Sequence, residues 1–222
     1  MASHLDLEEQ EQLDQLKAFW KRWGNLITWL ITAALAAFAA WQGWNWYQRE
    51  QAAKASAMYE EFDRALTAQD ADKAAAAAAD LKAGFAGTGF AAQASLQVAK
   101  LQLDKGKADD AKQNLTWVAE QGSEVAYRDL ARLRLAGLQL DAKAFDEAIK
   151  TLDAIKSPEF AALVADRRGD ALLLQDKRDA AKAEYQKALA GLDKTQDYRR
   201  IVEAKLATLG VPTAVETTGA AQ

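Results

Sequence analysis

The sequence contains no cysteine, only two prolines, and a single histidine, His4, among 222 residues. Without cysteine the chain forms no disulfide, no cysteine-ligated zinc site and no thiol nucleophile. The single histidine argues against two-histidine metal sites and histidine-dependent triads. Glycine is also scarce, at 12 residues, which argues against an all-β sandwich or barrel with its frequent turns. Alanine, leucine, lysine, glutamine and glutamate dominate, and these strong helix formers predict an all-α fold.

The balance of charge argues against a nucleic-acid partner. Lysine and arginine together number 28 and the acidic residues 32, for a formal net charge of −4. No basic excess is present to neutralise phosphates, so we expect no nucleic-acid partner.

One long segment carries no charge. No charged residue occurs between Arg22 and Arg49, and about 20 apolar residues suffice to span a bilayer. Six of the seven tryptophans lie in or beside it, at Trp20, Trp23, Trp29, Trp41, Trp44 and Trp46. Trp23 and Trp44 are separated by about 30 Å of helix, which suits two interfacial aromatic belts. We predict a cytoplasmic segment over residues 1–22 and a lipid-contacting transmembrane helix over residues 23–48.

Two other readings of this segment are weaker. A buried core helix has no reason to carry tryptophan at both ends. A cleaved signal peptide is suggested by Ala37-Phe38-Ala39, but the 22 residues before the apolar run are long and acidic for such a peptide. Three basic residues before the span against two after it indicate a cytoplasmic N-terminus. A reversed topology remains the alternative.

An internal repeat follows the apolar segment. Leu101-Gln102-Leu103-Asp104 recurs 37 positions later as Leu138-Gln139-Leu140-Asp141. A third copy follows at an offset of 33, where Asp179-Ala180-Ala181 matches Asp146-Glu147-Ala148. Each copy is typical of a helix, a short polar turn and a second helix. The turns are predicted at Lys105-Gly106-Lys107, Ala142-Lys143-Ala144 and Asp176-Lys177-Arg178.

The third copy resembles a tetratricopeptide repeat. Its small, large, small, aromatic and small positions are held by Gly169, Leu172, Ala181, Tyr185 and Ala188. A degenerate helix pair over residues 59–66 and 72–83 precedes the first clear copy. We therefore predict a tetratricopeptide-like α-solenoid over residues 49–210. Gly210 and Pro212 should end the last helix, with a disordered tail over residues 211–222.

A stacked array of this kind presents a concave surface lined by the first helix of each pair. The repeat offsets make seven residues candidates for a partner-binding groove: Gln93, Leu96, Lys100, Leu130, Leu133, Asp166 and Asp170. Two arginine pairs, Arg132/Arg134 and Arg167/Arg168, are further candidates for contact with an anionic partner, with a solvated helix face as the alternative.

Paired carboxylates occur at Asp109/Asp110, Asp146/Glu147 and Asp166/Asp170. Such pairs serve acid–base or metal chemistry in some proteins. Asp109/Asp110 and Asp146/Glu147 occupy the same place in two successive repeats, just before the second helix. A catalytic pair would not need to be repeated in this way. We interpret all three pairs as solvated turn and helix-start residues favoured by the helix dipole. We expect no catalytic residue, metal or cofactor, and predict that the chain is not an enzyme.

Taken together, these residues resemble the YfgM-like family, ancillary subunits of the bacterial SecYEG translocon. The resemblance covers nearly the whole chain and depends on the acidic N-terminus, the Lys17-Ala18-Phe19-Trp20 lead-in, the Trp-rich span and the order of repeats. Its most specific stretch is residues 151–156 followed by residues 160–172.

The resemblance implies a single-pass bacterial inner-membrane protein with a periplasmic repeat domain. It further implies association with SecYEG and with a membrane-anchored periplasmic chaperone of the prolyl-isomerase type (PpiD-like). The expected role is to assist the transfer of exported proteins to periplasmic chaperones. A structural scaffold in envelope assembly or cell division, built on the same repeat domain, is the alternative.

Overall fold

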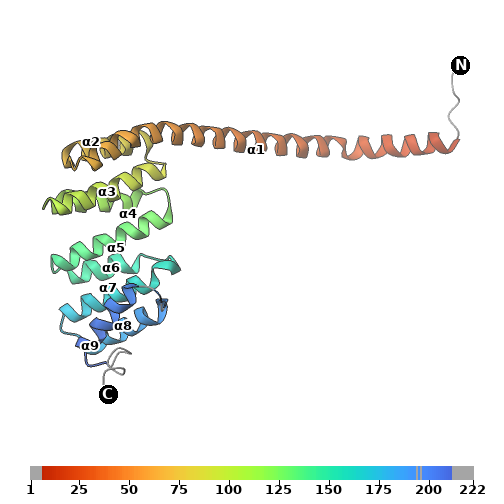
Figure 1. Ribbon diagram of the computed structural model, residues 1–222. Coiled ribbons are helices and arrows are strands. Elements are labelled where there is room, and N and C mark those ends of the chain that lie inside the picture. Colours follow the sequence, from red (N-terminus) through yellow and green to blue (C-terminus); the bar gives the residue numbers. More distant parts are fainter. Residues whose placement is uncertain (1–6, 194, 196, 212–222) are drawn as a thin grey trace. The chain divides into compact units, whose positions relative to one another are not determined.

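The computed structural model describes residues 7–193, 195 and 197–211 of the chain. Within these residues every regular element is a helix, so the predicted all-α class is confirmed (Figure 1). The chain divides after Gln51 into two units. His4 and all but Val211 of the predicted tail lie outside the described residues.

The first unit consists of helix α1, Leu7–Thr67, up to Gln51. Its large apolar side chains are exposed, among them Trp29, Trp41 and Trp44. The hydroxyls of Thr28 and Thr32 donate to backbone carbonyls one turn earlier, both at 2.8 Å, which satisfies them without water. Among the described residues this is the one helix long and apolar enough to cross a membrane. Because α1 continues beyond both ends of residues 23–48, those limits stay a prediction.

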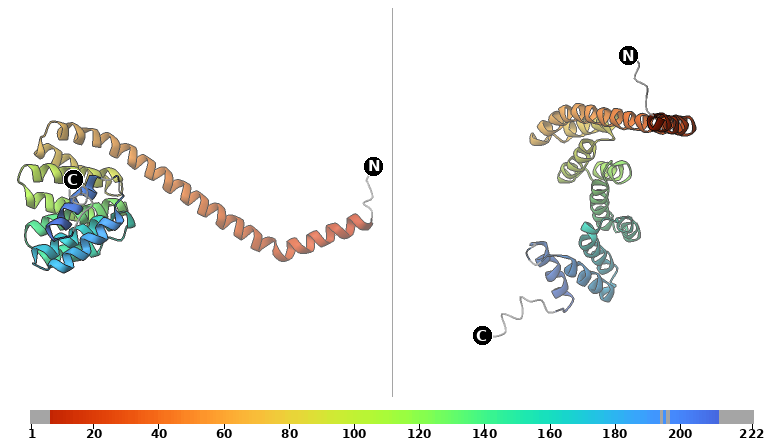
Figure 2. Two further views of the ribbon diagram at one scale, coloured as in Figure 1. Left: turned by 60° about the horizontal axis from the view of Figure 1, so that its bottom comes forward. Right: turned by 90° about the vertical axis from the view of Figure 1, so that its right-hand side faces the viewer.

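The second unit, from Ala52 onward, begins with the last part of α1 and continues as a stack of helices in chain order (Figure 1). The remaining helices are α2 Ala71–Phe85, α3 Gly89–Asp104, α4 Ala108–Gln121, α5 Val125–Asp141, α6 Phe145–Asp153, α7 Ala161–Leu174, α8 Arg178–Gly191 and α9 Asp197–Thr208. A 3₁₀ turn over Pro158–Phe160 leads into α7. Figure 2 shows the same succession of antiparallel pairs from two further sides.

The first helix of every pair ends in the same turn. Gln69, Gly106, Lys143 and Asp176 have positive φ angles between 55° and 76°, and they are spaced 37, 37 and 33 positions apart. At each turn the following N–H donates to the carbonyl five residues earlier, as Lys107 does to Gln102 at 2.8 Å. This is the Schellman arrangement that closes a helix. The spacing equals the offsets of the sequence copies, so the degenerate first pair is a repeat in full register.

Close approach of paired helices depends on small residues. Gly169 of α7 faces Tyr185 of α8, and a Cβ built on the glycine would lie 2.5 Å from the tyrosine ring. Tyr185 is completely buried, so the ring fills the space that glycine leaves. The small and aromatic positions predicted from the tetratricopeptide resemblance therefore perform that packing role.

The first helices of successive pairs form one layer. Helix α5 contacts both α3 and α7, in addition to its own partner α6. Trp117 of α4 lies between pairs, packing against the core clusters on both sides of it. The layer of first helices is the surface on which the sequence predicted a groove.

Candidate binding groove

A pocket of about 510 Å³ opens among helices α3, α5 and α7. Its walls include the completely buried Leu115 of α4 and four partly buried leucines: Leu103, Leu130, Leu133 and Leu138. Lys100, Arg134 and Arg167 also line it, together with a single carboxylate, Asp141. A pocket of this size and mixed lining is suited to an apolar group held beside a charged one.

A second pocket, of about 290 Å³, adjoins the first among α1, α3 and α5. It shares Lys100 and Arg134 with the larger pocket and adds Leu66, Gln97 and Asp104. We call the two pockets together the inner groove. Because the shared residues are both cations, positive charge lies where the two pockets join.

The three cations of the inner groove differ in how they are held. Arg134 donates from Nη1 to the carbonyl of Leu96 at 3.1 Å, and burial lowers the pKa of this guanidinium. Arg167 donates to Asp170 at 3.1 Å. Lys100 is exposed and pairs with no carboxylate among the described residues. Lys100 and Arg134 therefore retain unneutralised charge that an anionic group can approach.

The structure separates the seven candidate groove residues into three groups. Lys100, Leu130 and Leu133 lie together in the larger pocket. Gln93 is half-buried on α3 and lines neither pocket, while Leu96 is only 4% exposed and belongs to the core. The remaining two, Asp166 and Asp170, lie in a polar cluster elsewhere.

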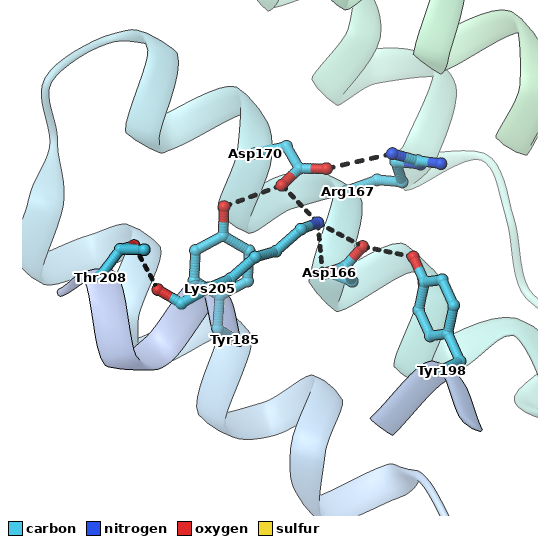
Figure 3. A network of polar contacts seen from close by, with 7 residues as sticks. All are labelled: Asp166, Arg167, Asp170, Tyr185, Tyr198, Lys205 and Thr208. Atoms are coloured by element: carbon cyan, nitrogen blue, oxygen red, sulfur yellow. Dashed lines mark hydrogen bonds and ion pairs between the residues drawn. The ribbon is translucent and has the colours of Figure 1, made fainter. Parts of the chain in front are cut away.

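That cluster joins the last three helices (Figure 3). The Lys205 ammonium of α9 donates to both oxygens of Asp166, at 2.8 and 2.9 Å, and to Asp170 at 2.7 Å. Tyr185 donates to Asp170 at 2.8 Å, and Tyr198 donates to Asp166 at 2.6 Å. Burial, followed by the hydrogen bonds to carboxylates, raises the pKa of both tyrosines, so both keep the proton that they donate.

The interpretation of Asp166 and Asp170 as solvated residues was wrong. Asp166 is completely buried, and its charge is compensated by Lys205, which lies 39 positions later in the sequence. Asp109/Asp110 and Asp146/Glu147, in contrast, occupy the first turns of α4 and α6 and are exposed. No group of three or more metal-ligating side chains gathers within the described part of the chain.

The four candidate arginines divide into two pairs with different roles. Arg134 and Arg167 line the inner groove, whereas Arg132 and Arg168 hold helices together. Arg132 donates to Asp129 at 2.7 Å and to the carbonyl of Ala119 at 3.0 Å, and Arg168 pairs with Asp153. Burial alone would raise the pKa of Asp129, but hydrogen bonds from Ser157 and Arg132 outweigh it and leave that pKa lowered.

Comparison with known proteins agrees with this architecture. Residues 17–211 match the family described as a tetratricopeptide repeat-like domain. The chain is 29% identical over 210 residues to the ancillary SecYEG translocon subunit of Neisseria gonorrhoeae. The aligned region covers 94% of this chain and the whole length of the relative. The proteins of that name from Escherichia coli and Haemophilus influenzae are 29% and 28% identical, over 91% and 82% of this chain and 97% and 89% of their own lengths.

These matches confirm both resemblances drawn from the sequence, to the tetratricopeptide repeat and to the ancillary translocon subunits. The apolar helix and the complete set of repeats fall within the aligned length. The chain belongs to the tetratricopeptide repeat-like domain family.

Proposed function

We propose that this chain is an accessory subunit of the Sec translocon in the bacterial inner membrane. The observation that carries the proposal is its similarity, over almost the whole length, to three proteins named ancillary SecYEG translocon subunit. Residues 1–22 face the cytoplasm, residues 23–48 span the membrane in contact with lipid, and the repeat domain stands in the periplasm. The exposed apolar surface of α1 supports the membrane assignment.

The repeat domain acts by binding proteins rather than by catalysis. Its inner groove combines apolar walls with unneutralised cations, which suits a protein segment. In this proposal the domain associates with a membrane-anchored, PpiD-like chaperone and assists the transfer of exported proteins to periplasmic chaperones. The membrane helix raises the local concentration of the groove near the channel exit, so that weak contacts suffice.

Co-purification tests the association. Tagged full-length protein, extracted in mild detergent, should carry the translocon subunits with it, and a variant lacking residues 1–48 should carry much less. Undiminished recovery with the truncated chain would remove the membrane helix from the mechanism. Recovery of division or envelope-assembly proteins in place of the translocon would replace this proposal with the scaffold.

Topology is tested separately with a single introduced cysteine, because the chain has none. Thr208 is exposed near the end of α9, so the variant Thr208→Cys should react with a membrane-impermeant maleimide from the periplasmic side of intact spheroplasts. Labelling only after the cells are lysed would indicate the reversed orientation.

A further inference from the structure

The two pockets of the inner groove are copies of one another. Five residues of the smaller pocket have counterparts in the larger pocket exactly one repeat, or 37 positions, later. These pairs are Leu66 and Leu103, Gln97 and Arg134, Lys100 and Gly137, Leu101 and Leu138, and Asp104 and Asp141. The same scaffold position therefore forms both pockets, and their differences come from the side chains that changed.

One change accounts for the larger size of the second copy. Lys100 lines the smaller pocket, and its counterpart in the larger pocket is Gly137. A Cβ added to Gly137 would meet nothing within 4 Å, so no packing against a neighbour requires glycine here. Glycine in a helix interior weakens the helix, and in this position it leaves open the space between four leucines.

A second change concentrates positive charge. Gln97 of the smaller pocket is replaced by Arg134 in the larger, and Lys100 and Arg167 stand beside it. The carboxylates, Asp104 and Asp141, are the last residues of α3 and α5, so they lie at the edge where the first helices end. Lys100 and Arg134 lie further back along the same two helices, and Arg167 lies on α7.

We propose that the larger pocket of the inner groove, which contains Gly137, anchors one leucine- or phenylalanine-sized side chain of an extended polypeptide. The residue next to that side chain in the polypeptide is acidic. The adjoining pocket has two leucines of its own, Leu66 and Leu101. Gln97 and Asp104 line that pocket as well, so the leucines of the two pockets do not form one uninterrupted apolar strip. A docked amphipathic helix would need an apolar strip several turns long. The acidic side chain meets Lys100 and Arg134. The inference rests on the proposed function only in taking the groove as the surface that engages proteins.

Blocking the pocket tests the apolar anchor. The probe is the fluorescein-labelled peptide Ser-Gly-Glu-Phe-Leu-Gly-Ser, titrated by anisotropy against full-length protein in lipid nanodiscs, with empty nanodiscs as the blank. Gly137→Leu should weaken binding at least about tenfold, because burial of one large apolar side chain is lost. Gly84→Leu is the matched control, since Gly84 is also a helical glycine with open space around it, on α2 outside the groove. It should leave the affinity unchanged.

Changing the charge tests the acidic neighbour. A peptide with Gln in place of Glu should bind about threefold to fivefold more weakly, as expected for an exposed ion pair, and one with Lys more weakly still. Lys100→Gln should reduce the difference in affinity between the Glu and Gln peptides, because Arg134 alone would remain to meet the acidic side chain. Lys112→Gln, an equivalent change at an exposed position of α4, should preserve it.

Equal binding of the Glu, Gln and Lys peptides would overturn the acidic part of the proposal, and tight binding by Gly137→Leu would overturn the anchor. Failure of every peptide to bind, while the full-length chain still co-purifies with the translocon, would end this inference and leave the proposed function standing. If the peptides bind in the expected order of affinity but the full-length chain does not co-purify with the translocon, the inference about the pocket stands and the proposed function is overturned.

Discussion

The polar cluster at the end of the solenoid offers the sharpest test of how the repeats are held together. Lys205→Met removes the ammonium that compensates Asp166, which is completely buried, and Asp170, which is 19% exposed at its side chain. Tyr198 would remain as a donor to Asp166, and Arg167 as a donor to Asp170. No cation among the described residues would remain bonded to Asp166.

The size of the effect follows from that burial. Removing one partner of a buried ion pair costs about 3 to 5 kcal/mol, because the remaining charge is left without compensation. The Lys205 side chain is 24% exposed, so water offsets part of the loss when it is removed. We expect the free energy of unfolding to fall by about 2 to 3 kcal/mol.

A double-mutant cycle separates this electrostatic cause from lost packing. Asp166→Asn makes the buried group neutral, so the combination with Lys205→Met should be about 1 to 2 kcal/mol more stable than Lys205→Met alone. Lys112→Met is the control, since Lys112 is exposed on α4 and pairs with no carboxylate in the described part of the chain.

Urea unfolding of the full-length protein in detergent micelles gives the free energies, and amide hydrogen exchange locates the change. Exchange should accelerate in α9 first and least in α3, because neighbouring repeats share the stability of a solenoid only locally. A loss below about 1 kcal/mol, in the range of an exposed pair, would show that solvent reaches the cluster and would refute the reasoning.

Three further predictions concern the helices and their turns. Gly169→Ala should destabilise the domain by about 1 to 3 kcal/mol, because its Cβ would collide with the buried Tyr185 ring; Gly137→Ala, which meets nothing, should stabilise it by up to about 1 kcal/mol in the same urea titration. Lys143→Gly should stabilise by about 0.5 to 1 kcal/mol, since Lys143 has φ of 60° and glycine adopts that conformation without strain; a lower urea midpoint would contradict this. The lowered pKa of Asp129 means that its contribution is complete above the unfolded-state pKa of about 3.9 and is lost as pH falls through the folded-state value. Unfolding followed from pH 7 to pH 2 should therefore show wild type and Asp129→Asn converging in acid, and a constant gap would count against this assignment.

Periodicity was sufficient to predict the fold. The offsets of 37 and 33 appear in the sequence copies and again in the left-handed turn residues from Gln69 to Asp176. The third turn lies one residue earlier than predicted, over residues 175–177, because Asp176 and not Lys177 adopts the left-handed conformation. Local pattern identifies such turns well, since their hydrogen bonds join residues close in sequence.

The groove was harder to predict, because a repeat offset identifies equivalent positions but not the surface they face. Leu96, Leu133 and Asp166 are equivalent by those offsets, yet Leu133 lines a pocket while the other two are buried. Asp166 is buried because α9 covers the last pair, where Lys205 and Tyr198 reach it. Tyr198 and Lys205 lie 32 and 39 positions after Asp166. Contacts between residues so far apart produce no local sequence pattern from which the burial of Asp166 could be predicted.

The same repetition that makes the fold predictable allows the pockets to diverge. In a solenoid each repeat contacts only its neighbours, so a change on the exposed layer of first helices disturbs little of the core. Replacing the lysine position of one repeat by Gly137 in the next opens a pocket without altering any turn or helix boundary. At the end of the array no further repeat exists among the described residues. Helix α9 covers the last pair there, with Val202 and Leu206 in the core and Lys205 in the ionic cluster. Buried charges need partners in a suitable geometry, so the cluster adds a directional contact to the apolar packing of α9.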